Sequence, residues 1–319
     1  MVKLSKEITF EIEPIPPYSF ELTIRKPAGW PLFTPLEIYD KGIIWTAAHI
    51  HGLLTGIKLE SRGTTEQPKM AAALFLKNVP KQELLEGIMR CLIHDLAADE
   101  DLAEFYELAR RDCILRHAVV DLYGMHSTSP STIFPDAALA ILLQMTTLKR
   151  SNEMMNCLIR RYGEVADFDG KKIPVWPLPK RIAKIEAPDL AKACNLGYRA
   201  KHLANLARKL TSEEFPGMEE LERLEPEEAK RRLLELPGIG DYSADIINPH
   251  GGFPIDAWSA DVFGRLFFGE EPKDRRKAIE GIKREGLRRW GKWSWMAFLY
   301  VVQDLENLLM KLGMELRLE

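Results

Sequence analysis

The chain has 319 residues, of which 46% are hydrophobic and 29% charged, and its formal net charge is −3. These values are typical of a globular protein with a sizeable core and room for two domains, and they exclude a disordered chain. The small negative charge excludes a uniformly basic surface, although a local patch would still allow nucleic-acid binding. No apolar run is long enough to span a membrane and the N-terminus is mixed and acidic, so we expect a cytoplasmic protein without a signal peptide.

The first hundred residues have the pattern of a β-rich domain. Apolar and polar residues alternate over two short stretches, and two longer runs are also β-like, which together predict an antiparallel sheet. A helical pattern follows them, and one apolar run between is ambiguous. The predicted strands are Ile8–Ile12, Phe20–Ile24, Gly42–His49 and Leu53–Glu60, the ambiguous run is Ala71–Leu76, and the predicted helix is Lys81–Leu96.

From Leu102 onward the pattern is helical, with a Ser/Thr/Pro loop at His126–Thr132 as a plausible boundary. An apolar run, Ala138–Leu143, ends in Gln144, and Asp169–Pro179 is expected to be a loop. The predicted fold class is α+β, mainly α. We expect an N-terminal antiparallel β-sheet domain at residues 1–100, an inner helical core at about 132–255, and outer helices at 101–125 and 256–319.

The cysteines stand singly along the chain, at Cys91, Cys113, Cys157 and Cys194. Because no two of them form a CxxC pair, the spacing predicts neither a zinc knuckle nor a disulfide framework. A reducing compartment is therefore expected. The sequence also predicts no bound metal and no organic cofactor.

A short glycine-containing segment, Leu236-Pro237-Gly238-Ile239-Gly240, separates two helical patterns. The first begins at Pro226 and is stopped by Pro237. The glycines then allow a sharp turn, and Asp241 is a suitable N-cap for a second helix, Tyr242–Ile247. Backbone N–H groups beside a helix N-terminus suit a phosphate. The alternative is an ordinary corner between two helices.

The glycine-containing segment is a more specific sequence signal when it is considered together with the acidic residue that follows it. A hairpin, a second helix, a loop and then Pro254-Ile255-Asp256 opening a further helix resemble the helix-hairpin-helix superfamily of base-excision DNA glycosylases. The resemblance covers roughly residues 134–305, includes the segment Leu196–Lys201 (LGYRAK), and extends loosely to the N-terminal domain of the 8-oxoguanine and bacterial alkylpurine branch. The matching positions are Leu236, Pro237, Gly238, Gly240, Ala244, Asp245, Asp256, Val262 and Arg265.

The resemblance implies a role for each part of the site. The hairpin would hold a DNA phosphate through main-chain amides, and Asp256 would lie at the sugar of a flipped-out nucleotide. A monovalent cation at the hairpin is allowed, whereas an iron–sulfur cluster is excluded because four closely spaced C-terminal cysteines are missing. The implied hairpin residues are Leu236, Pro237, Gly238, Ile239, Gly240 and Asp241.

The loop after Gln144 corresponds to the segment that wedges into DNA in this family. A side chain that fills the gap left by an extruded base lowers the cost of unstacking. Gln144, Met145 and Leu148 are the candidates for this role. For Met145 and Leu148 the alternative is simple core packing.

The chemistry of base release favours a single carboxylate. The sugar acquires positive charge as the base leaves, and a carboxylate beside it stabilises that charge and can orient or deprotonate water. A cationic alkylated base departs neutral and needs no second acid, unlike the leaving group of a sugar glycosidase. Asp256 is therefore the catalytic candidate; its alternative role is a helix N-cap, and Asp261 is a less favoured acid inside the helix.

Tyr242 decides the expected mechanism. Branches of the family that also nick the strand carry a Lys at this position, whose amine forms a Schiff base with the sugar. Tyr242 cannot do so, which predicts a monofunctional enzyme and fits an aromatic wall for an electron-poor base. Ile246 and Val302 are aliphatic where the alkylpurine branch places aromatic residues. Trp258 is a second candidate for the base pocket, with core packing as its alternative role.

We therefore expect a monofunctional DNA glycosylase of base excision repair that acts, as a monomer, on an alkylated or deaminated purine such as 3-methyladenine in double-stranded DNA. Excision of 8-oxoguanine is the alternative within the enzyme class. A non-catalytic damaged-DNA-binding protein on the same scaffold is the alternative outside it. Nine basic residues between Lys273 and Lys292 could flank the DNA backbone or simply form a solvated face.

Overall fold

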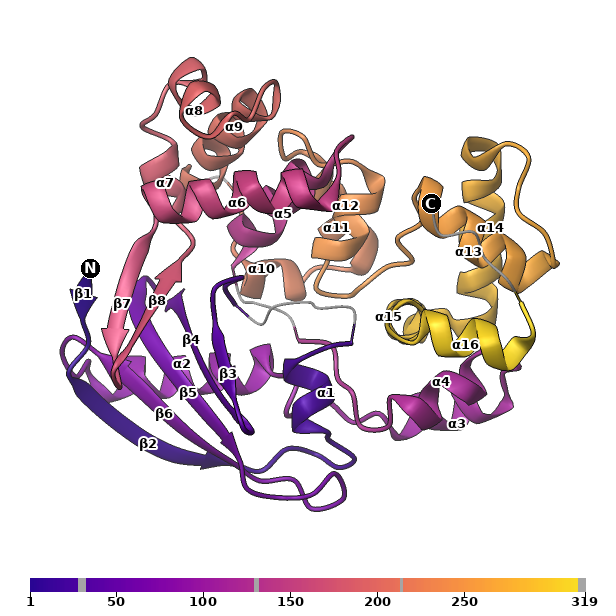
Figure 1. Cartoon of the computed structure of the whole chain (residues 1–319), viewed down its shortest axis with the longest axis horizontal. Helices are drawn as coiled ribbons and strands as arrows, with labels where there is room; N and C mark the ends of the chain where they lie inside the picture. Colours follow the sequence, from indigo (N-terminus) through magenta and orange to yellow (C-terminus); the bar gives the residue numbers. More distant parts are fainter. Residues whose placement is uncertain (28–32, 129–131, 213–214, 315–319) are drawn as a thin grey trace.

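The computed structural model describes residues 1–27, 33–128, 132–212 and 215–314. The chain forms two sheets that pack together and two helical lobes, and Figure 1 shows the sheets at the lower left with the lobes above them and to their right. The predicted fold class, α+β and mainly α, is confirmed. No helix in the described ranges is long and apolar enough to cross a membrane.

The N-terminal part is built on a five-stranded antiparallel sheet with the order β2-β6-β5-β4-β3. Helix α2 (Gln82–Asp95) packs on one face through a cluster that includes Ile57, Leu74 and Ile88. The predicted strands at residues 8–12, 42–49 and 53–60 and the predicted helix are confirmed, and the ambiguous run is a strand. The strands are β2 (Lys6–Ile12), β3 (Ile38–Asp40), β4 (Ile43–Ile50), β5 (Leu53–Ser61) and β6 (Met70–Leu76).

Two segments differ from the sequence pattern. Phe20–Ile24 was expected to be a strand but forms the short helix α1, because the Ser19 hydroxyl accepts a hydrogen bond from the Leu22 amide and caps it. The predicted loop after Asp169 contains strand β8 (Lys171–Val175), which pairs with β7 (Glu164–Phe168). This hairpin adds β1 (Val2–Lys3) alongside and covers the other face of the sheet.

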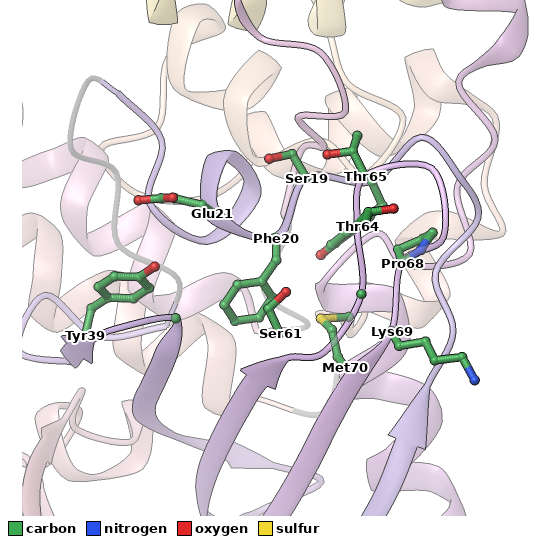
Figure 2. A pocket seen from close by; sticks show the side chains of 13 residues that line it. Ser19, Phe20, Glu21, Tyr39, Ser61, Thr64, Thr65, Pro68, Lys69 and Met70 are labelled. Carbon is green, nitrogen blue, oxygen red and sulfur yellow. The ribbon is translucent and has the colours of Figure 1, made fainter.

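A cavity of about 230 Å³ lies where α1 meets the turn between β5 and β6. Figure 2 shows the hydroxyl side chains of Ser19, Ser61, Thr64 and Thr65 around it. The residues that line it belong to the N-terminal part of the chain, and none is a predicted site residue. This cavity is therefore separate from the site described below.

The helices form two lobes, each with its own core. The first core contains buried residues between 133 and 247, and the second contains residues 102–125 together with 253–309. The first lobe contains α5 (Ile133–Leu143), α6 (Leu148–Tyr162), α7 (Pro179–Ile182), α8 (Ala187–Cys194), α9 (Arg199–Thr211), α10 (Met218–Glu222), α11 (Pro226–Leu234) and α12 (Asp241–Ile247). The second contains α3 (Ala103–Arg111), α4 (Leu115–Asp121), α13 (Ala257–Phe268), α14 (Arg275–Trp290), a 3₁₀ turn (Gly291–Trp293), α15 (Ser294–Gln303) and α16 (Leu305–Leu312).

The chain passes from the first lobe to the second between Ile247 and Phe253, since these residues belong to different cores. The hairpin therefore lies on one side of the junction and Asp256 directly beyond it. The predicted boundary loop, His126–Thr132, is partly outside the described residues. The domain limits at residues 100, 132 and 255 stay predictions.

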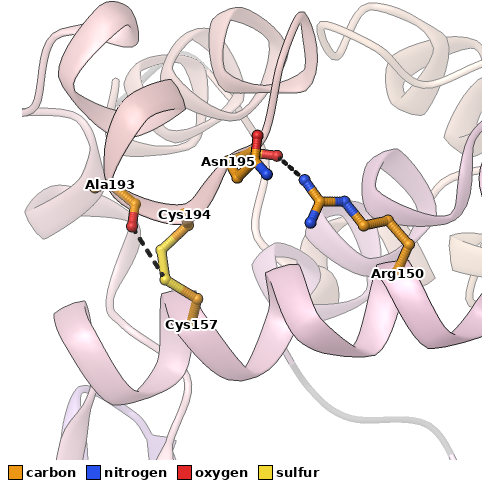
Figure 3. Close-up of a disulfide and its surroundings, with 5 residues drawn as sticks. All are labelled: Arg150, Cys157, Ala193, Cys194 and Asn195. Carbon is orange, nitrogen blue, oxygen red and sulfur yellow. Dashed lines mark hydrogen bonds between the residues drawn. A yellow bond between two sulfur atoms is a disulfide. The ribbon is translucent and has the colours of Figure 1, made fainter.

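The expectation of no disulfide was wrong. Cys157 of α6 and Cys194, the last residue of α8, are bonded to each other, as Figure 3 shows. Their sequence separation of 37 gives no hint of this contact, which arises because α6 and α8 pack side by side in the first lobe with the two Cα atoms 5.5 Å apart. Cys91 and Cys113 take part in no disulfide within the part of the chain that the structure describes.

Candidate active site

The turn between α11 and α12 is held by its apolar residues. Leu236 and Ile239 are buried in the core of the first lobe, and the Ile239 amide donates to the Leu236 carbonyl at 3.1 Å. Gly238 has φ +86°, a left-handed conformation that favours glycine. A Cβ at Gly238 would lie 3.0 Å from the Cβ of His202 on α9. The turn is thus tightly packed on its inner side.

The backbone at Gly240, unlike that at Gly238, has free space where a side chain would start. Its φ is −105°, and a Cβ built on it meets no atom within 4 Å. The structure makes Gly240 the N-cap of α12 and Asp241 the first residue of the helix, so the prediction of Asp241 as the cap was wrong. The reason is that the Asp241 carboxylate is bound by lysines instead of backbone amides. The N-terminus of α12 beside Gly240 therefore has open space in front of it.

Two aspartates and two lysines form a charge cluster behind this helix start. Asp245, only 3% exposed, receives ion pairs from Lys230 of α11 at 2.6 Å and from Lys283 of α14 at 2.7 Å. Both lysines also pair with Asp241. Partial burial alone would raise the pKa of Asp241, but the hydrogen bonds from Lys230 and Lys283 bring that pKa below its usual range. Since Lys283 belongs to the second lobe, the cluster ties the hairpin helix to that lobe.

Asp256 is the N-cap of α13, so its alternative role as a cap is real. Its Oδ1 accepts hydrogen bonds from the Ser259 amide at 2.8 Å and from the Ser259 hydroxyl at 2.7 Å. The Asp256 amide in turn donates to the Ser259 hydroxyl at 2.8 Å. Within the described parts of the chain, Oδ2 accepts no hydrogen bond and forms no ion pair. The cap thus fixes the carboxylate through one oxygen and leaves the other available.

Tyr242, directly after the hairpin, lies within electrostatic reach of this carboxylate. Burial chiefly, and the negative charge of Asp256 secondarily, raise the pKa of the Tyr242 hydroxyl above its usual range. Trp258 is 42% exposed, so the alternative of plain core packing does not describe it. Asp261 forms an ion pair with Arg275 at 2.6 Å, which occupies that carboxylate. Of the two candidate acids, Asp256 is the one whose charge acts on a residue of the hairpin helix.

The loop after α5 presents two apolar side chains to solvent. Met145 is 94% exposed and Leu148 is 73% exposed, which contradicts core packing for both. Gln144 behaves differently: its side-chain amide donates to the Gly238 carbonyl at 2.7 Å. Of the three wedge candidates, Met145 and Leu148 are therefore free to contact a ligand, while Gln144 links the loop to the hairpin turn.

Neighbouring acids pair with most cations of the basic stretch that includes α14, residues 273–292. Six of the nine cations form ion pairs, namely Arg275, Lys277, Lys283, Arg288, Arg289 and Lys292. Lys273, Arg276 and Arg284 form no ion pair with any described residue. The stretch is better described as a solvated face than as a basic patch.

Two residues near the site were not singled out from the sequence. Trp295 of α15 lies against Gly251 in the loop that leads to Asp256, at 2.6 Å from a Cβ built there, and its indole donates to the Ser127 hydroxyl at 2.9 Å. Arg199 of α9 bonds the backbone of the loop after α5. The LGYRAK segment pointed to Arg199, but no role followed from the pattern alone.

Comparison with known proteins gives the following matches. A family model described as HhH-GPD superfamily base excision DNA repair protein matches residues 138–285. The chain is 26% identical over 176 aligned residues to the DNA-3-methyladenine glycosylase of Bacillus subtilis. The aligned region covers 54% of this chain and 58% of that protein. It is 25% identical over 232 aligned residues to the probable N-glycosylase/DNA lyase of Methanothermobacter thermautotrophicus, and the aligned region covers 65% of this chain and 72% of that protein. The match thus spans little more than half the length of the Bacillus relative.

Two solved structures resemble the whole fold. The 3-methyladenine DNA-glycosylase from Archaeoglobus fulgidus has a TM-score of 0.74 and 22% identity, with 93% of this chain and 98% of that chain covered. The Clostridium acetobutylicum 8-oxoguanine glycosylase/lyase in its apo-form has a TM-score of 0.69 and 16% identity, with 95% and 98% covered. At these identities the likeness establishes the fold alone.

Proposed function

We propose, since the chain belongs to the HhH-GPD superfamily of base excision DNA repair proteins, that it is a DNA glycosylase. Its substrate would be a damaged purine in double-stranded DNA, of the 3-methyladenine type or deaminated. The name of the Bacillus relative supports this class. The observation that carries the proposal is the geometry of Asp256, fixed through Oδ1 with Oδ2 available, close to a tyrosine that follows the hairpin directly.

The chain's own residues would share the work as follows. The amides beside Gly240 would hold a phosphate, because the helix N-terminus there is open. The Asp256 carboxylate would stabilise positive charge on the sugar and orient the attacking water. Tyr242 would stack on the extruded base through its aromatic ring.

Release without strand cleavage is part of the proposal. A lyase needs a neutral amine at the sugar. Lys230 and Lys283, whose amines contact the hairpin helix, are paired with Asp241 and Asp245. Burial lowers the pKa of Lys26 to about 8, but its amine donates to the Thr23 carbonyl and the Thr128 hydroxyl, next to α1. The name of the Methanothermobacter relative favours the alternative of a glycosylase with lyase activity.

The test uses three duplexes that carry a stable 3-methyladenine analogue, hypoxanthine or 8-oxoguanine, each incubated with the full-length protein. We expect base release from one of the first two, with strand breaks only after hot alkali. Breaks without alkali would establish the lyase alternative, and release of 8-oxoguanine alone would establish the other enzyme. Damage-selective binding with no release would identify a non-catalytic binding protein.

The glycines of the hairpin give a prediction about DNA affinity. Gly240→Val should lower affinity for every duplex alike by about 10- to 100-fold, since a hydrogen bond to a charged group contributes about 1.5–3 kcal/mol. A Cβ at Gly240 meets no atom, so the new side chain fits, and folding stability should fall only by the cost of valine at a helix N-cap, about 1 kcal/mol. Binding is measured by fluorescence anisotropy with damaged and undamaged duplexes.

Gly238→Ala is the matched control. Its positive φ and the contact with His202 should cost about 1–2 kcal/mol of folding stability. A Gly240→Val protein that binds normally would show that the hairpin holds no phosphate. A cation at the hairpin, a monomeric state and a cytoplasmic location stay predictions.

A further inference from the structure

We infer that Arg199 is a positioning residue that fixes the loop between α5 and α6 so that Met145 projects toward the DNA. The inference rests on the proposed function, because it assigns a device to the same site. The Arg199 guanidinium donates to the Gln144 carbonyl and, at 3.4 Å, to the Met145 carbonyl. Arg199 is a buried residue, and both bonds are partly shielded from solvent.

The loop needs such a partner for two reasons. Gln144 is the C-cap of α5, and carbonyls at a helix C-terminus lack intrahelical partners and attract cations. Met145 has φ +48°, a left-handed conformation that is strained for a residue other than glycine. The guanidinium satisfies both carbonyls on either side of this turn. It thereby stabilises a backbone conformation that exposes an apolar side chain.

Arg199 is itself held in place. Its guanidinium lies over the ring of Tyr198, 4.7 Å from the ring centroid, and the Tyr198 hydroxyl donates to the Gln144 carbonyl at 3.5 Å. Both bonds to the loop come from one guanidinium nitrogen, Nη2, while the plane of the group lies over the Tyr198 ring. A lysine ammonium keeps the charge but has no plane to stack on that ring. The arrangement is therefore specific for arginine.

The loop is fixed on its other side by the hairpin. The Gln144 amide bonds the Gly238 carbonyl at 2.7 Å, and Arg150, at the start of α6, donates to the Asn195 carbonyl at 2.6 Å, as Figure 3 shows. Met145 is thus presented beside the turn that would hold the phosphate. A wedge that is already in position fills the gap in the stack without a further ordering cost.

The experiment is a double-mutant cycle on Arg199→Met and Met145→Gly. Each single variant should lower single-turnover base release about tenfold, the order of effect expected when a reacting group is slightly misplaced. The double variant should be no slower than Met145→Gly alone, because Arg199 acts through Met145. Arg199→Lys, which keeps the charge, should recover only part of the rate.

A second readout needs no catalysis. With 2-aminopurine at the target position, both single variants should lose most of the fluorescence increase that accompanies flipping, while affinity for undamaged duplex changes less than twofold. This separates the two proposals: a chain that releases no base but shows these fluorescence changes disproves the glycosylase activity and retains the positioning role.

Arg208→Met on the same helix is the control, since Arg208 contacts the Ala183 carbonyl and Glu186 instead of the loop. It should leave both readouts unchanged. Additive losses in the double variant, or a full flipping signal in Arg199→Met, would overturn the inference. If Arg199→Met proves unstable in thermal unfolding, the cycle is run with Arg199→Lys, and additive losses there overturn it equally.

Discussion

An Asp256→Asn variant should release the damaged base about 10²- to 10⁴-fold more slowly than the unchanged protein, the range over which a positioned acid or base acts. The substitution removes the negative charge that would face the developing positive charge on the sugar. Asparagine keeps an oxygen that can accept from the Ser259 amide, so the cap of α13 remains. Single-turnover release from the best of the three duplexes measures the effect.

Binding and folding should survive this change. The hairpin is untouched, so affinity for a duplex with an abasic-site analogue should be equal or slightly higher, since one negative charge near the DNA is removed. The thermal midpoint should stay within the range of a surface substitution. A loss of release together with retained binding then locates the defect in the chemical step.

Asp261→Asn is the matched control on the same helix. Asp261 is paired with Arg275, so its replacement should change the rate only severalfold. Normal release by Asp256→Asn would remove Asp256 from the mechanism. A large loss in Asp261→Asn with little loss in Asp256→Asn would move the assignment to the other acid.

The hairpin could be predicted from the sequence because its determinants are local. Pro237 ends one helix, Gly238 takes the left-handed conformation, and the buried pair Leu236 and Ile239 anchors the turn. Periodicity also predicted three strands and helix α2 correctly. In each case a few residues that are neighbours in the sequence determine the backbone conformation, and distant contacts do not change it.

Other features depend on contacts that are distant in sequence. The alternation of apolar and polar residues at Phe20–Ile24 is typical of a strand, yet the segment is a helix whose N-terminus is capped by the Ser19 hydroxyl. The hairpin β7–β8 was not predicted because its short strands are supported by the N-terminal part of the chain, through pairing of β7 with β1 and packing on the five-stranded sheet. The lysines that bind Asp241 come from α11 and α14, so the pattern could not show that Asp241 is no cap.

The site itself was predicted only in part for the same reason. Asp256 and the hairpin follow one another within the chain, and their relation was visible as a spacing. Arg199 reaches the loop after α5 across 55 positions, and Trp295 comes from the last core helix. Such partners are set by the packing of the lobes, which no single sequence displays.

The disulfide gives the second large effect, on stability. Replacing both Cys157 and Cys194 by Ser should lower the free energy of unfolding by about 4 kcal/mol, which is the chain-entropy value for a loop closed over a separation of 37 residues. This is a large part of the stability of an ordinary domain. Urea unfolding without reductant measures the change, and the slope against urea should rise because the unfolded chain becomes less compact.

Cys113→Ser is the control, since Cys113 is an exposed free thiol, and its replacement should leave the unfolding curve unchanged. The denatured, unreduced protein should expose two titratable thiols, from Cys91 and Cys113. Four thiols, or a double variant as stable as the unchanged chain, would mean that α6 and α8 are joined by packing alone. A stabilising bond is the expected result because Cys194 is buried in the core of the first lobe. The bond also joins α8 to α6, the helix that begins directly after the loop carrying Met145, and so helps to hold one end of that loop.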